Sequence, residues 1–94
     1  MGNSKAMVNA VWSPERDATP EIQEICDKMK PDACSSAGVI FDDFTAIKYI
    51  FQFDNEAQEM KYSIRVHVAS GKYLHLEVTE SPSKELKFIG CLYP

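Results

Sequence analysis

Residues 62–78 decide the fold of this chain, and they read YSIRVHVASGKYLHLEV. Apolar and polar residues alternate on both sides of a short break that contains Gly71, a pattern typical of an antiparallel β-hairpin. We predict that Ala69 pairs with Tyr73 across a three-residue loop, which gives the hairpin one continuous apolar face. The predicted pairs on this face are Val68 with Leu74, Val66 with Leu76 and Ile64 with Val78.

The other face of the hairpin is polar. The predicted register places His67 opposite His75 and Arg65 opposite Glu77. Two imidazoles that gain charge together repel each other, so we expect mild acid sensitivity of this hairpin. The two histidines could also hold a metal ion, but no third ligand is evident and we expect no metal site.

A helix that covers the apolar face is predicted just after residue 18. Thr19 is a suitable capping residue, Pro20 suits the first helical position, and Gly38 suits the exit. Pro31 lies inside the pattern and predicts a kink or an end nearby. The apolar residues that recur at helical spacing are Ile22, Ile25, Cys26, Met29 and Ala33.

The rest of the chain predicts further strands and one flexible segment. Residues 44–53 are rich in aromatic and β-branched residues, with Ile47, Tyr49, Phe51 and Phe53 on one face. Residues 86–91 predict a final short strand. Residues 1–18 show no apolar period and are interpreted as a flexible N-terminal arm. The chain of 94 residues is therefore a single α+β domain, one long helix and an antiparallel sheet of four to five strands.

Composition narrows the classes of function. The formal net charge is −4 without a basic run, which argues against a nucleic-acid partner. No apolar stretch is long enough to span a membrane, and the opening MGNSKA has Ala6 where a myristoylation signal prefers Ser or Thr. The chain has three cysteines, and this odd number favours reduced thiols over disulfide bonds. Reduced thiols in turn predict a cytoplasmic location. We expect no cofactor.

The helix start and the hairpin together resemble the stefins, the single-domain intracellular branch of the cystatins. The segments that carry the resemblance are ATPEIQEI at 18–25, DK at 27–28, KP at 30–31, IRV at 64–66 and KYLHLEV at 72–78. The helix start is most similar to stefin A, also called cystatin A. The resemblance covers roughly residues 10–91. It implies a twisted sheet wrapped around a helix that continues through Pro31 with a local bend.

The resemblance also implies reversible, non-covalent inhibition of papain-like cysteine proteases. Family members insert the N-terminal arm and two hairpin loops into the protease cleft as a wedge. Carried over by position, the residues implied in binding are Ala10, Val11 and Trp12 in the arm, Gln52, Phe53, Asp54, Asn55 and Glu56 in the first loop, and Ser81, Pro82 and Ser83 in the second.

The chain departs from the family in this wedge. The first loop of the family is usually Q-V-V-A-G, of which only Gln52 remains, and Ala10 stands where the family has Gly. Carboxylates at Asp54, Glu56 and Glu59 are costly in a dry cleft, although a protease with a basic rim would favour them. We expect weak inhibition or altered specificity. The alternative is a stefin-fold interaction module that has lost inhibition.

An enzymatic role has little support in the sequence. Cys34, His67 and nearby acids could form a cysteine nucleophile site, but no local signature accompanies them, and we expect no enzyme. We expect a monomer, with a domain-swapped dimer as the alternative. Exposed edge strands and a hinge at residues 54–59 motivate that alternative.

Overall fold

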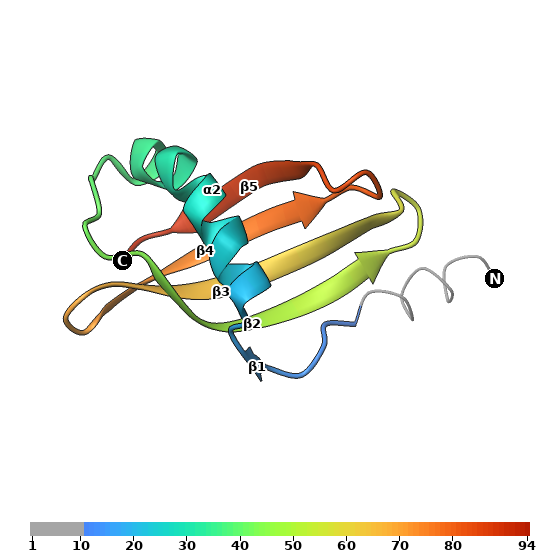
Figure 1. The fold of residues 1–94 in the computed structure, drawn as a ribbon, viewed down its shortest axis with the longest axis horizontal. Helices are drawn as coiled ribbons and strands as arrows, with labels where there is room; N and C mark the ends of the chain where they lie inside the picture. The colour runs from blue at the N-terminus through green and yellow to red at the C-terminus, as the bar shows by residue number, and fades with distance from the viewer. Residues whose placement is uncertain (1–10) are drawn as a thin grey trace.

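The computed structural model describes residues 11–94, which form one helix and a five-stranded antiparallel sheet (Figure 1). The elements in chain order are β1 (Arg16–Asp17), α2 (Pro20–Ala37), β2 (Thr45–Asp54), β3 (Glu59–Ala69), β4 (Lys72–Glu80) and β5 (Leu86–Leu92). The strands lie in the sheet in the same order, so each one pairs with its neighbour in sequence. The α+β arrangement expected from the sequence is confirmed, and β2 and β5 begin and end within one residue of the predicted strands.

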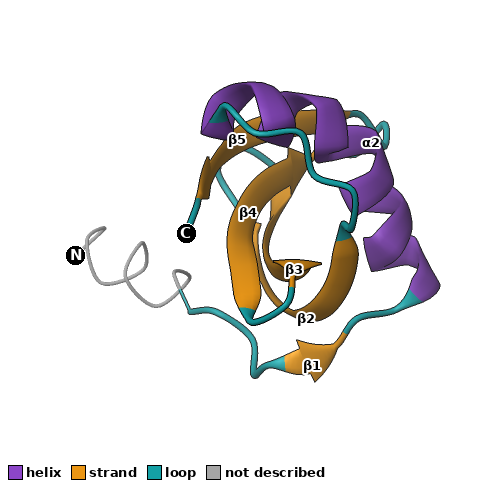
Figure 2. Cartoon of the chain, turned by 90° about the vertical axis from the view of Figure 1, so that its left-hand side faces the viewer, coloured by secondary structure: helices purple, strands orange, loops and turns teal. Residues whose placement is uncertain are grey.

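Helix α2 begins and ends at the residues that the sequence indicated. The Thr19 hydroxyl accepts a hydrogen bond from the Ile22 amide at 3.2 Å, which satisfies a donor left free at the helix start. Gly38 adopts a left-handed conformation at φ 72°, and its amide donates to the Cys34 carbonyl at 2.9 Å. The helix continues through Pro31, as the resemblance implied, and its axis changes direction along its length (Figure 2).

The core lies between one face of α2 and one face of the sheet. Its buried helix residues are Ile22, Ile25, Cys26, Met29 and Ala33, all of which were predicted. Its buried strand residues are Ile64, Val66, Val68, Leu74, Leu76 and Val78, and Phe41 and Phe44 close it from the connection that precedes β2. Burial of this apolar surface is the main favourable contribution to folding.

The predicted register of the β3–β4 hairpin is wrong by two residues. Ala69 pairs with Lys72 across a turn that contains Gly71 at φ 68°, and the register then shifts between His67 and Ala69. A slip of two residues leaves every side chain on its own face, so the apolar pattern cannot distinguish the two registers. The observed pairs include Val66 with Leu74, Ile64 with Leu76, His67 with Tyr73, Arg65 with His75 and Ser63 with Glu77.

The observed register also removes the predicted pair of histidines. His67 lies opposite Tyr73, and their rings meet edge to face with centres 5.4 Å apart. His75 lies opposite Arg65. The expected repulsion between two imidazoles and the metal interpretation both depended on His67 facing His75, so both lose their basis.

A second irregularity changes the predicted face of β2. The register with β3 shifts between Ala46 and Lys48, so the alternation changes phase at Ile47. Ala46 and Tyr49 pack against the core on the two sides of this point, whereas Ile47 does not belong to the core cluster. Tyr49, Phe51 and Phe53 share one face as predicted, and the Tyr49 and Phe51 rings stack with their centres 6.3 Å apart. Ile47 alone departs from the predicted face.

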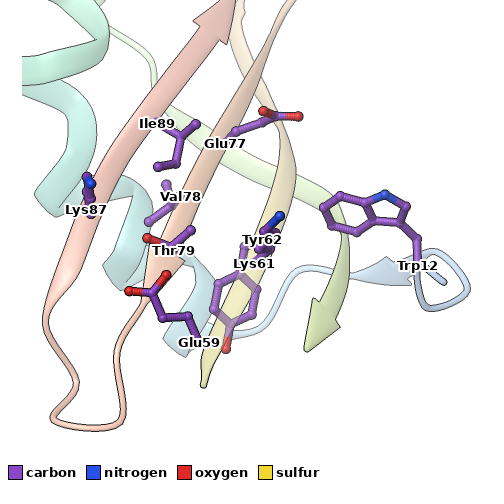
Figure 3. A pocket seen from close by; sticks show the side chains of 9 residues that line it. All are labelled: Trp12, Glu59, Lys61, Tyr62, Glu77, Val78, Thr79, Lys87 and Ile89. Atoms are coloured by element: carbon purple, nitrogen blue, oxygen red, sulfur yellow. The ribbon is translucent and has the colours of Figure 1, made fainter. Parts of the chain in front are cut away.

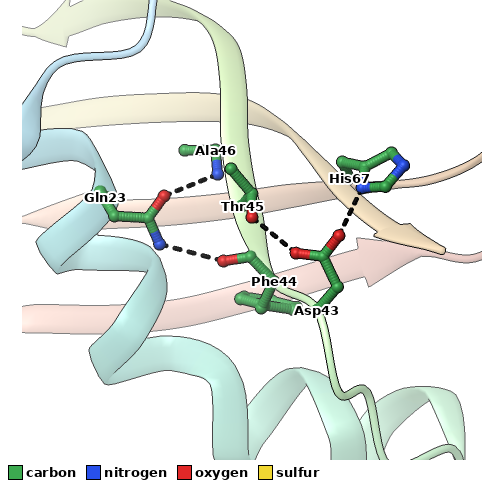
Figure 4. Close-up of polar contacts among 6 residues, drawn as sticks. All are labelled: Gln23, Asp43, Phe44, Thr45, Ala46 and His67. Atoms are coloured by element: carbon green, nitrogen blue, oxygen red, sulfur yellow. Dashed lines mark hydrogen bonds and ion pairs between the residues drawn. The ribbon is translucent and has the colours of Figure 1, made fainter.

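Two polar side chains, Gln23 and Asp43, fix the connection between α2 and β2 (Figure 4). The Gln23 side chain donates to the Phe44 carbonyl at 3.0 Å and accepts from the Ala46 amide at 2.8 Å. The Asp43 carboxylate accepts from the Thr45 hydroxyl at 2.6 Å and lies 2.6 Å from Nδ1 of His67. These bonds hold the start of β2 against both the helix and β3.

Candidate functional site

Three segments meet at one end of the sheet, which we call the loop end (Figure 1). Loop 1 (residues 55–58) joins β2 to β3, and loop 2 (residues 81–85) joins β4 to β5. The register places the two loops side by side, because Met60 pairs with Glu80 at the ends of adjacent strands. The arm, residues 11–18, runs toward the same end along the edge of β2 that does not pair with β3. The turn between β3 and β4 lies at the opposite end.

Loop 1 is a tight turn held by its own side chains. Oδ1 of Asp54 accepts from the amides of Glu56 and Ala57 at 3.0 and 3.2 Å. The Gln58 side chain donates to the Asn55 carbonyl at 2.6 Å, and Gln58 adopts a left-handed conformation at φ 57°. Bonds of this kind let an aspartate imitate a backbone turn, so the loop is ordered before any partner arrives.

The residues predicted for the first loop divide between strand and turn. Gln52 and Phe53 belong to β2, where they pair with Lys61 and Met60. Phe53 still exposes 43% of its surface beside the turn. The exposed tip consists of Asn55, Glu56, Ala57 and Gln58. Position-by-position transfer from the family missed the last two, although the polar run 54–59 had marked the segment as a connection.

Loop 2 is organised around Ser81. Its amide donates to the Glu85 carbonyl at 2.9 Å, and its carbonyl accepts from the Lys84 amide at 2.9 Å. Its hydroxyl accepts from the Glu85 amide at 3.1 Å and lies 2.8 Å from the Ser83 hydroxyl. Pro82 and Ser83 are exposed. Lys84, at φ 71°, and Glu85 also belong to this loop and were not among the predicted site residues.

The arm runs alongside β2 and includes β1, a short strand that was not predicted separately. The Ser13 amide donates to the Phe51 carbonyl at 2.7 Å, and the Phe51 amide donates to the Ser13 hydroxyl at 2.9 Å. The Arg16 guanidinium lies 5.1 Å from the centre of the Phe51 ring. Lys48 binds Asp17 at 2.5 Å, and this hydrogen bond lowers the pKa of Asp17.

Trp12 forms one wall of a hollow of about 310 Å³ at the loop end (Figure 3). Lys61 and Lys87 line this hollow on the face of the sheet that points away from α2, together with Glu59 and Ile89. Trp12 exposes 38% of its surface, and the neighbouring Val11 is more exposed. Ala10 and the opening MGNSKA lie outside the described residues, so their predicted roles stay predictions.

The residues of the enzymatic alternative are not arranged as a nucleophile and its base. His67 is half-buried on the polar face of the hairpin, and its Nδ1 lies 2.6 Å from the Asp43 carboxylate. Cys34 lies near the end of α2, where its carbonyl accepts the bonds that cap the helix. Burial raises the pKa of Cys26 to about 12, which keeps that thiol protonated and unreactive at neutral pH.

The chain is similar over most of its length to several known proteins. It is 38% identical to leukocyte cysteine proteinase inhibitor 1 of Sus scrofa over 90 residues, which cover 93% of this chain and 84% of that protein. It is 38% identical to stefin-2 of Mus musculus over 73 residues, covering 78% and 68% respectively. It is 35% identical to cystatin-A of Homo sapiens over 75 residues, covering 80% and 74%. No protein-family model matches the chain.

One helix on an open antiparallel sheet, with two hairpin loops and an arm at one end, defines a cystatin-like α+β protein. The sequence similarities above agree with this arrangement. The chain belongs to the stefin family, the type 1 cystatins. Among residues 11–94, no helix is both long and apolar enough to cross a membrane.

Proposed function

We propose that this protein is a reversible, non-covalent inhibitor of papain-like cysteine proteases of the cathepsin type, acting in the cytoplasm. One relative bears the name of a cysteine proteinase inhibitor. The observation that carries the proposal is the gathering of the arm and both hairpin loops at the loop end (Figure 1). Such an inhibitor occupies the protease cleft and performs no chemistry, so it needs no catalytic residue.

The internal order of the two loops supports this proposal. Asp54 holds loop 1 through two amide bonds, and Ser81 holds loop 2 through its amide, its carbonyl and its hydroxyl. A segment that is already ordered loses little conformational entropy on docking, so its contacts convert efficiently into affinity. The residues that we assign to the protease contact are Ala10, Val11, Trp12, Gln52, Phe53, Asp54, Asn55, Glu56, Ser81, Pro82 and Ser83.

The second candidate function is a stefin-fold module that binds another protein and no longer inhibits proteases. The observation in its favour is the polar tip of loop 1, where Asn55, Glu56 and Gln58 are exposed. A dry protease cleft penalises such groups unless the protease provides partners for them. Both candidate functions use the same fold, so only a measurement of protease binding distinguishes them.

Titration of papain and of cathepsins B, L and H with the purified protein is the direct test. We expect inhibition at submicromolar concentration for at least one of these enzymes, released on dilution because no covalent bond forms. No inhibition at high micromolar concentration, with circular dichroism showing a folded protein, would favour the second candidate. Slow cleavage of the added protein would have to be excluded by mass spectrometry.

Replacing Phe53 by Ala tests the contact that we assign to the loop end. Phe53 exposes 43% of its surface beside loop 1, so its truncation should remove protease contact without opening the core. We expect the inhibition constant to rise at least tenfold, which corresponds to about 1.4 kcal/mol. Ile40→Ala is a matched control, because Ile40 is 87% exposed and precedes the other end of β2. Equal effects of both substitutions would contradict the assignment.

A further inference from the structure

The three carboxylates of the first hairpin, which look equivalent in sequence, have three different environments. Asp54 is half-buried and accepts amide hydrogen bonds from Glu56 and Ala57 at 3.0 and 3.2 Å. Its charge is therefore partly compensated by the turn that it holds. Within the protease contact, Asp54 therefore contributes chiefly by fixing the shape of loop 1.

Glu59 is directed elsewhere, because it lies on β3 rather than in the turn. It lines the hollow of which Trp12 forms one wall, and the cations Lys61 and Lys87 line the same hollow (Figure 3). Glu77 lines this hollow as well, and Glu59 takes part in none of the ion pairs formed within residues 11–94, so Glu59 differs from Glu56 by its position on the strand. Glu59 does not project from the end of the hairpin.

Glu56 is the carboxylate that remains at the tip. It is exposed, and its backbone amide is fixed by Asp54, so the position of its Cα is set by the turn. None of the ion pairs formed within residues 11–94 involves Glu56. Its charge is therefore presented to whatever surface meets the tip of loop 1.

We infer that Glu56 determines specificity by selecting papain-like proteases that carry a basic side chain on the cleft rim facing loop 1. This inference rests on the proposed inhibitory function. Docking removes water from the carboxylate, which weakens binding to a protease without a partner for it. A lysine or arginine on the rim compensates that loss and increases the rate of encounter, since opposite charges steer association.

The test compares wild type, Glu56→Gln and Asp32→Asn as inhibitors of papain and of cathepsins B, L and H. Asp32 is an exposed acid in the second half of α2, so Asp32→Asn removes the same charge away from loop 1. For Glu56→Gln we expect the ratio of mutant to wild-type inhibition constants to differ at least tenfold between proteases. The ratio should exceed one for the enzyme that wild type inhibits best, and Asp32→Asn should leave all constants within twofold.

Salt provides a second readout for the best-inhibited protease. Raising NaCl from 20 to 300 mM should slow association of wild type several-fold, because ions screen the attraction, and should slow Glu56→Gln less. Ratios within threefold of one another across the panel, with unchanged salt dependence, would overturn the inference and leave the proposed inhibition intact. Failure of wild type to inhibit any of the four enzymes would overturn the proposed function, and the inference with it.

Discussion

At the scale of single residues, the contact between Asp43 and His67 replaces the repulsion that sequence alternation suggested. Nδ1 of His67 lies 2.6 Å from the Asp43 carboxylate, so this imidazole meets a negative charge and not a second imidazole. The Thr45 hydroxyl and His67 both lower the pKa of Asp43, the Thr45 hydrogen bond contributing most. Loss of stability in acid should therefore follow protonation of Asp43.

Asp43→Asn is expected to lower the urea midpoint of unfolding at pH 7. Because its folded pKa is below the unfolded value of about 4, Asp43 stabilises the fold above that pH, and this contribution is lost as the pH falls through the folded value. The difference between wild type and variant should therefore shrink as the pH falls below about 4. Asp42→Asn, which removes an exposed charge one residue away, serves as control. A constant difference between pH 7 and pH 3 would contradict the role given to the Asp43 charge.

At the scale of elements, the cap of α2 illustrates what sequence alone can predict. Thr19→Ala removes the hydroxyl that accepts from the Ile22 amide, and we expect a loss of about 1 kcal/mol in the free energy of unfolding. Thr19→Ser keeps an acceptor in the same place and should retain most of the stability. Urea denaturation of the three proteins measures both effects. Equal losses for Ala and Ser would mean that packing of the Thr19 methyl group, rather than the cap, is responsible.

The helix and most of the strands could be predicted because local signals and burial agree. Thr19, Gly38 and the apolar stripe specify the helix, and the alternation of residues 62–78 specifies which side chains are buried. The register could not be predicted, since a slip of two residues preserves that alternation and only the turn at Gly71 decides it. The register shift at Ile47 could not be predicted either, because nothing in the amino-acid composition of β2 marks it.

The site was less predictable than the fold for a related physical reason. Exposed residues are not constrained by packing, so the binding role of the loop residues came only from the resemblance, and the resemblance is weakest there. It placed Phe53 near the tip but assigned Gln52 to a loop that begins only at Asn55. It could not separate Asp54, which holds the turn, from Glu56, which projects from it.

At the scale of the whole molecule, the sheet is open and its strands follow chain order, so exchange of β-hairpin segments between two copies is topologically simple. Such an exchange requires loop 1 to open and β2 to continue directly into β3. Opening would relieve the left-handed conformation of Gln58, which is unfavourable for a residue with a Cβ atom. It would also break the two amide bonds of Asp54. The relief of strain at Gln58 favours opening of loop 1, whereas the loss of the Asp54 hydrogen bonds disfavours it.

Gln58→Gly and Asp54→Ala should therefore shift dimer formation in opposite directions. Gln58→Gly removes the exposed side-chain bond to the Asn55 carbonyl, but glycine adopts φ 57° without steric cost. We expect the relief of backbone strain to outweigh the lost bond, so the substitution should stabilise the closed turn and reduce the dimer fraction after heating and slow cooling. Asp54→Ala removes two bonds worth about 1 kcal/mol each and should increase the dimer fraction severalfold. Size-exclusion chromatography with light scattering, at one protein concentration, measures all three proteins. Similar dimer fractions in the three samples would show that dimerisation does not proceed through loop 1, since an exchange hinged there must respond to both substitutions.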